Sequence, residues 1–149
     1  MIAIGLRMTT PRPSLEADLA ELHSLVGRDG LTTLDGNALA DLQRSHPHLP
    51  SDYFRFLRDF GFGGLGRSRF MLYSGPVQPS DIFDPDSTLC RATLILVGDN
   101  FAGDHLGYVW ASDAWRLCFF DHLCLGDPEP LAEGSIVRFF LSYFEEPDD

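Results

Sequence analysis

The chain has 149 residues, a length typical of one domain that buries its own core without disulfides or metal ions. Its 22 acidic residues outnumber 11 basic residues, all of them arginine, and the formal net charge is −11. Such a surface repels nucleic-acid backbones, so the charge argues against direct DNA or RNA binding and favours a basic protein partner. Acidity that serves solubility alone is the simpler alternative.

Three amphipathic helices are predicted in the first half of the chain, over residues 14–26, 35–44 and 51–60. In the first, leucines recur every three or four residues on one face, and Asp18 is expected on the outer face. Ser14 and Ser51 are the expected N-caps, and Gly27 is the expected end of the first helix. The third helix has the clearest aromatic stripe, which predicts a deeply buried face.

The second half of the chain is dominated by β-rich segments, with strands predicted over residues 70–73, 94–97, 106–111 and 116–120. Turns rich in Gly, Asp and Asn separate the last three, as in an antiparallel meander. An aromatic helix over residues 135–144 follows, with Ser135 as its cap. Helices followed by strands and a final helix predict the α+β class, with an antiparallel or mixed curved sheet packed against helices.

A glycine-rich run follows the third helix, and Gly61, Gly63 and Gly66 literally match the dinucleotide-binding pattern G-x-G-x-x-G. That motif requires a strand before it and a helix after it, whereas here the order is reversed. We therefore interpret the run as a helix C-cap followed by a turn, and expect no cofactor.

Two clusters of ionisable residues are candidates for chemistry. Asp99, Asp104 and His105 share one turn and could bind a divalent ion, but their spacing fits no EF-hand loop or zinc motif, and Asp and Asn are favoured in tight turns. Asp121 and His122 could belong to a Ser-His-Asp set, yet neighbours on one strand point to opposite faces and should not pair. No nucleophile elbow accompanies them. We predict neither a catalytic nor a metal site.

Two tryptophans bracket the last turn of the meander. Trp110 shares a strand face with Tyr108 and Leu106 and is predicted to belong to the core. Trp115 follows a polar turn, and an exposed Trp beside acids is a candidate interface anchor. A Trp folded over a strand end is the alternative.

The order of these motifs resembles the SUKH superfamily, the Smi-Knr-like cell-wall-assembly domain. The resemblance rests on Leu49-Pro50 with Tyr53, Phe56 and Leu57 before a Gly-rich turn, Ile95 to Asp99 with Gly103-Asp104, Arg116-Leu117 with Phe119 to His122, and the closing aromatic helix. It implies an α+β fold of helices on a curved sheet and no shared catalytic set. Bacterial members are commonly immunity proteins that bind and block a cognate toxin, and fungal relatives are regulatory scaffolds.

The cysteines and the apolar pattern set the expected cellular compartment. Cys90, Cys118 and Cys124 are too few and too irregular for a disulfide framework, and no apolar run reaches membrane-spanning length. The N-terminal segment lacks the pattern of a secretory signal. A cytoplasmic protein is expected, with a SUKH-like domain over residues 14–145, a flexible extension over 1–13 and an acidic tail over 146–149.

These observations lead to the hypothesis of a non-enzymatic immunity protein that occludes the active site of a cognate, basic, nuclease-like toxin domain. A negative surface would mimic the charge of the toxin's phosphate substrate. Tyr73 is a further candidate for apolar anchoring, and the expected partner-binding residues are Asp81, Asp84, Asp86, Asp99, Asp104, Trp115 and Asp121. A regulatory scaffold without a toxin partner is the alternative, and a metal-dependent hydrolase using Asp99, Asp104, His105 and His122 is a more distant one.

Overall fold

The computed structural model describes residues 14–67, 69–124 and 128–145. The predicted extension over 1–13 and the predicted tail over 146–149 lie outside the described residues. The described part has four α-helices and two short 3-10 helices: α2 (Leu15–Val26), α3 (Gly36–Ser45), α4 (Ser51–Phe60), η1 (Pro79–Asp81), η2 (Thr88–Arg91) and α5 (Ile136–Glu145). None of these helices has both the length and the apolar character needed to cross a bilayer.

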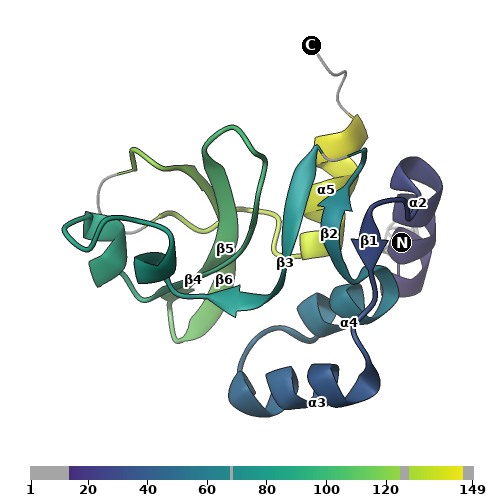
Figure 1. Ribbon diagram of the computed structural model, residues 1–149, viewed down its shortest axis with the longest axis horizontal. Helices are drawn as coiled ribbons and strands as arrows, with labels where there is room; N and C mark the ends of the chain where they lie inside the picture. Colours follow the sequence, from purple (N-terminus) through teal and green to yellow (C-terminus); the bar gives the residue numbers. More distant parts are fainter. Residues whose placement is uncertain (1–13, 68, 125–127, 146–149) are drawn as a thin grey trace, which may run out of the picture.

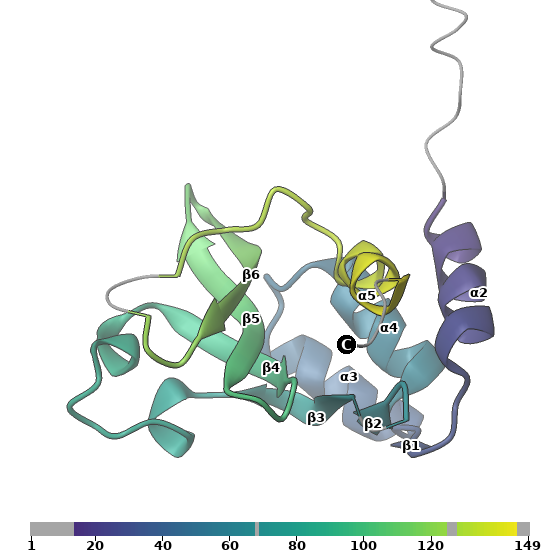
Figure 2. The same cartoon turned by 90° about the horizontal axis from the view of Figure 1, so that it is seen from above.

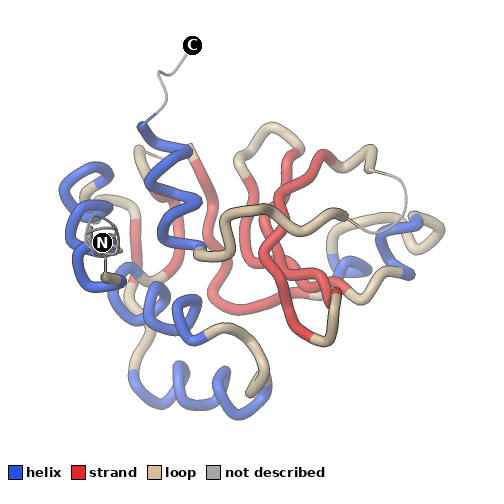
Figure 3. The backbone as a smooth tube through the Cα atoms, turned by 180° about the vertical axis from the view of Figure 1, so that it is seen from behind, coloured by secondary structure: helices blue, strands red, loops and turns tan. Residues whose placement is uncertain are grey.

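Six strands form one sheet in chain order, and each neighbouring pair is antiparallel. They are β1 (Leu31–Thr32), β2 (Phe62–Leu65), β3 (Phe70–Val77), β4 (Leu94–Asp99), β5 (Asp104–Ala111) and β6 (Ala114–Asp121). The sheet is open and curled, and the helices gather beside its β1–β3 part (Figures 1 and 3). The predicted α+β class with an antiparallel sheet is confirmed.

The central strand β4 is buried on both faces. Ile95 and Val97 belong to a core shared with the helices, whereas Leu94 and Leu96 belong to a second, smaller core on the opposite face. Side chains alternate between the faces of a strand, so a continuous apolar run requires cover on both sides. The fold therefore needs two layers around β4.

The larger core lies between the sheet and helices α2, α4 and α5 (Figure 2). Aromatic rings dominate it: the Phe56 and Phe140 rings stack at 5.3 Å, and Phe70 from β3 meets Phe140 edge-on at 4.9 Å. Offset and edge-on pairs of this kind add to the free energy of burial. They join α4 and α5 to the sheet.

The smaller core is covered by the segment that carries η1 and η2. Leu89 from η2 is fully buried there against Leu96 and Cys118. In Figures 1 and 2 the two 3-10 helices lie at the opposite end of the molecule from α2. Burial raises the pKa of Cys118 to about 12, so its thiol stays protonated and inert at neutral pH, as expected of a core thiol.

The helix starts follow the predicted caps with one exception. Ser14 at the start of α2 and Ser135 before α5 each accept a hydrogen bond from the backbone N–H three residues later. Asp35, for which no cap was predicted, does the same at the start of α3. The prediction that Ser51 caps α4 was wrong, because Pro50 holds the N-cap position and supplies no side-chain acceptor. The φ of Pro50, −59°, suits the start of a helix without a capping side chain.

The glycine-rich run also differs from its prediction beyond the cap. Gly61 ends α4 with a φ of +85°, as expected, but residues 62–65 form β2 instead of a turn. A Cβ at Gly63 would lie 2.4 Å from the carbonyl oxygen of Gly30, so glycine permits the close approach of the segment before β1. The run therefore supplies a strand that joins β1 to the rest of the sheet.

Strands β4 and β5 approach each other closely at Gly107. A Cβ there would lie 2.2 Å from the carbonyl oxygen of Ile95 in β4. We expect Gly107→Ala to lower the free energy of unfolding by about 3 kcal/mol, because the backbones of β4 and β5 must separate. Urea unfolding measures the change, and the control is Gly36→Ala, where no atom lies within 4 Å and stability should stay level or rise slightly. Equal effects at both sites would contradict this account.

Candidate functional site

Three of the predicted partner-binding carboxylates lie at one end of the sheet. Asp99 ends β4, Asp104 begins β5 and Asp121 ends β6. Asp104 is the direct cross-strand partner of Asp121, and Asp99 is paired with His105. Antiparallel pairing thus brings together acids that are 22 residues apart in the chain, the separation of Asp99 and Asp121.

The turn between β4 and β5 is held by its own polar side chains. The Asn100 side-chain oxygen accepts hydrogen bonds from the backbone N–H groups of Ala102 and Asp104, at 2.9 and 3.1 Å, and its amide donates to Asp104 at 2.9 Å. One Asp99 oxygen accepts the Phe101 N–H, and the other accepts the Tyr73 hydroxyl at 2.6 Å. This matches the predicted turn role of these residues.

A shallow cavity of about 390 Å³ adjoins this turn. Asp81 joins Asp99 in its lining, and the other lining residues are Tyr73, Val77, Ile82 and His105. Burial and the nearby Asp99 carboxylate raise the pKa of Tyr73, so its hydroxyl stays a donor. The cavity combines two carboxylates with an apolar wall, a composition suited to a basic side chain with an aliphatic stem.

Asp84 and Asp86 extend the acidic surface along the segment between η1 and η2. Both are exposed, and the Asp84 carboxylate accepts the Asp86 N–H at 2.9 Å. The Phe83 ring meets His105 edge-on at 4.9 Å, which fixes this segment against the acidic end of the sheet. Four of the six predicted carboxylates, Asp81, Asp99, Asp104 and Asp121, therefore lie at this end through strand pairing or the shared cavity, and Asp84 and Asp86 follow Phe83 in the adjoining segment.

Within the described residues, no arginine neutralises the charge at this end. None of the six carboxylates forms an ion pair with arginine there, whereas all five acids that do so lie on α2, α3, α4 or just before α5: Glu16, Asp18, Asp41, Asp59 and Glu133. Burial lowers the pKa of His105, so its ring is neutral at pH 7 and does not offset the acids. The sheet end therefore carries a concentrated negative field.

The expectation that Asp121 and His122 do not pair was wrong. His122 Nδ1 lies 3.3 Å from an Asp121 oxygen. Strand β6 ends at Asp121, so the alternation of faces that motivated the expectation does not extend to His122. Both side chains are exposed, and a single exposed pair of this kind contributes little to stability.

The structure separates the tryptophans from the acids. Trp110 and Trp115 are cross-strand partners beside the β5–β6 turn, with ring centroids 5.5 Å apart. Six residues along β6 place Trp115 about 20 Å from Asp121. Trp115 is partly buried against the larger core, and Trp110 is 41% exposed, so the prediction that Trp110 belongs to the core was wrong. Side chains still alternate between the two faces of β5, but the helices that cover one face do not extend over Trp110 at the β5–β6 turn.

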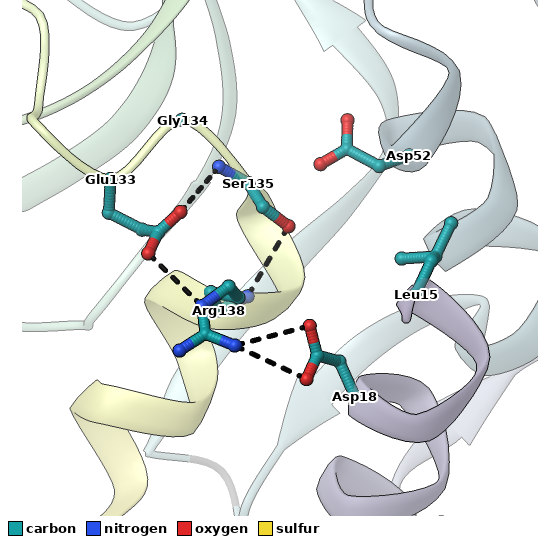
Figure 4. A pocket seen from close by; sticks show the side chains of 7 residues that line it. All are labelled: Leu15, Asp18, Asp52, Glu133, Gly134, Ser135 and Arg138. Carbon is teal, nitrogen blue, oxygen red and sulfur yellow. Dashed lines mark hydrogen bonds and ion pairs between the residues drawn. The ribbon is translucent and has the colours of Figure 1, made fainter. Parts of the chain in front are cut away.

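A second pocket, which sequence reasoning missed, lies between α2, α4 and α5 (Figure 4). Asp18 was expected on the outer face of its helix, yet it is only 5% exposed, and its carboxylate meets the Arg138 guanidinium at 3.4 Å. Asp52 from α4 accepts the Ile136 N–H at 3.2 Å and so caps α5. The sequence did indicate the burial of Asp18, because Asp18 follows Leu15 by three residues and so lies on the same helix face as the leucines.

This pocket has a structural role in joining the helices. Arg138 contacts both Asp18 and Glu133, and Asp52 satisfies the first turn of α5, where backbone N–H groups lack helical partners. Nowhere in the described ranges do three or more His, Cys, Asp and Glu side chains form a group able to hold a metal ion. Comparisons with protein-family models, curated proteins and solved structures found no match, so the functional argument rests on geometry.

The Asp52 cap predicts a pH dependence of stability. Burial is the largest influence on Asp52 and raises its pKa above the value in the unfolded chain, so the folded state favours the protonated carboxyl. The stability that this preference contributes is present at low pH and is lost as pH rises through the folded pKa. Asp52→Asn keeps an oxygen acceptor for Ile136 without the charge. We expect the variant to gain stability relative to the parent between about pH 4 and pH 7 in urea titrations.

The matched control is Asp35→Asn, which makes the same change at the exposed cap of α3. It measures the effect of replacing a carboxylate by an amide at an exposed cap, so its stability relative to the parent should not rise between about pH 4 and pH 7. A stability difference between parent and Asp52→Asn that stays constant or shrinks towards neutral pH would contradict the assignment.

Proposed function

We propose that this protein is a non-enzymatic immunity protein that binds a basic toxin domain in the cytoplasm and occludes its active site. The observation that carries the proposal is the cluster of carboxylates at the β4–β5 end of the sheet, which has no arginine to neutralise it among the described residues. A surface built only for solubility would have no need to concentrate charge at one end.

The physical mechanism is charge mimicry. A nuclease cleft presents arginine and lysine side chains to the phosphates of its substrate, and a protein surface with carboxylates at a similar density competes for the same groups. Each pair of opposite charges at 4 Å near a protein surface attracts by about 4 kcal/mol before desolvation. Several such pairs accelerate association and select a basic partner over a neutral one.

Two further features support binding over catalysis. The carboxylates of Asp99 and Asp104 are engaged by Tyr73, Asn100 and backbone N–H groups, which holds them as fixed charges. The resemblance of the motif order to the SUKH superfamily agrees with an immunity role, because that family has no shared catalytic set. A regulatory scaffold would use the same surface, and the presence of a toxin gene beside this one distinguishes the two.

Co-expression with the toxin domain encoded beside this gene tests the proposal directly. We expect the wild-type protein to restore growth and to form a complex whose association slows steeply as salt is raised. The triple variant Asp84→Asn, Asp86→Asn and Asp121→Asn should lower the association rate constant about tenfold at low salt and flatten its salt dependence, measured by stopped-flow mixing. Amide oxygens still accept the local backbone hydrogen bonds, so the fold is retained.

The control carries the same change in charge on the helical side, as Glu21→Gln, Asp29→Asn and Asp41→Asn. These three residues are exposed and lie on or beside α2 and α3. Their neutralisation should leave association within about twofold of wild type. Equal slowing by both sets would mean that net charge acts without a defined docking end, and failure of the wild-type protein to rescue growth would refute the proposal.

A further inference from the structure

Phe101 occupies a position in the β4–β5 turn where an aromatic residue is unfavourable. Its φ is +65°, in the left-handed region that bulky side chains rarely adopt, and its side chain is 56% exposed. Packing offsets neither the backbone strain nor the exposure of the ring. Phe101 lies outside both hydrophobic cores, and its ring contacts no other aromatic ring of the described residues. The fold does not require this ring.

The turn nevertheless holds Phe101 in place. The Asp99 carboxylate accepts the Phe101 N–H at 2.9 Å, and the Asn100 side chain accepts the next N–H, from Ala102, at 2.9 Å. Across the hairpin, the His122 N–H donates to the Gly103 carbonyl at 3.0 Å. A residue in a strained conformation that its surroundings enforce is a reason to look for function. The backbone of Phe101 is therefore already ordered before any partner binds, which lowers the entropic cost of binding.

Two other exposed apolar side chains lie at this end of the sheet. Ile82 lines the cavity that also contains Asp99, and Leu123, 73% exposed, follows the His122 that bonds to the turn. The described residues include five large exposed apolar side chains, Leu25, Ile82, Phe101, Trp110 and Leu123, and three of them share this end. Asp81, Asp99, Asp104 and Asp121 lie at the same end.

We infer that Phe101 is an apolar anchor of a docking surface at this end of the sheet, which also carries Ile82 and Leu123, and that its occupant is a basic protein domain with an apolar pocket bordered by arginine or lysine. The identity of that domain as a toxin rests on the proposed function. The Phe101 ring enters the pocket, and the surrounding carboxylates pair with the basic border. Aromatic residues at the centre of an interface with a polar rim dominate many binding energies.

Charge selects this occupant over two others. A second copy of this chain would bring the same carboxylates face to face across a two-fold axis, and an anionic lipid surface would repel them in the same way. A basic partner neutralises the carboxylates in the contact where the aromatic ring is buried. The acidic rim and the apolar centre therefore point to the same class of partner.

The decisive variant is Phe101→Gly, because glycine adopts a φ of +65° without strain. We expect its melting temperature to equal or exceed that of the wild type, while its affinity for the adjacent toxin domain falls at least about 30-fold in calorimetric titration. The matched control is Trp110→Ser, which removes an exposed aromatic ring at the opposite end of β5. It should change affinity by less than about threefold.

The outcomes separate the inference from the proposed function. If the wild-type protein neither binds the toxin domain nor rescues growth, the proposed function fails, and the partner assigned here fails with it. If the wild type binds and Phe101→Gly binds equally well, the proposed function stands and the anchor is refuted. A marked fall in the melting temperature of Phe101→Gly, or a wild-type dimer that this variant dissociates in sedimentation, would also overturn the inference.

Discussion

The two-sided burial of β4 is the constraint on which the rest of the structure depends. Leu94 to Val97 forms a continuous apolar run in an antiparallel sheet, and such a strand is stable only when both faces are covered. The helices cover one face through Ile95 and Val97, and the segment between β3 and β4 covers the other through Leu89. That second cover also brings Asp81 and Ile82 to the end of the sheet where β4 stops, so the candidate site is a by-product of completing the core.

Within the described residues, acids are paired with arginines on the helical side of the molecule but not at the β4–β5 end of the sheet. On the helical side, arginines meet acids in pairs such as Arg55–Glu16 and Arg138–Asp18. At the β4–β5 end the carboxylates have no such partners within the described ranges, and their mutual repulsion works against the folded state. The direct cross-strand pairing of Asp104 with Asp121 is a specific instance, since like charges opposite one another destabilise a sheet. A basic partner would convert this repulsion into binding free energy.

The sequence was sufficient for the elements whose signals are local. Periodicity identified α2, α3, α4 and α5, and turn residues identified the β4–β6 meander, because these features depend on neighbours within a few positions. Strands β1 and β2 were missed, since two and four residues around glycines carry no alternation and pair only through tertiary contacts. The burial of Asp18 depended on Arg138, 120 residues away, and the exposure of Trp110 on where the helical cover ends. Of the candidate site, the sequence indicated the acids but not Ile82, His105 as a cavity wall, or the position of Phe101.

Asp99 connects the structural and the functional accounts of this end. One carboxylate oxygen accepts the Tyr73 hydroxyl from β3, and the other accepts the Phe101 N–H in the turn. The same carboxylate therefore lines the cavity and holds the backbone of the turn at Phe101. Hydrogen bonds to a charged group contribute about 1.5–3 kcal/mol, which is comparable to the cost of a bulky residue in the left-handed region. The carboxylate that receives the Tyr73 hydroxyl thus also holds the backbone of Phe101 in its strained conformation, so one side chain contributes both to the negative field and to the placement of the apolar anchor.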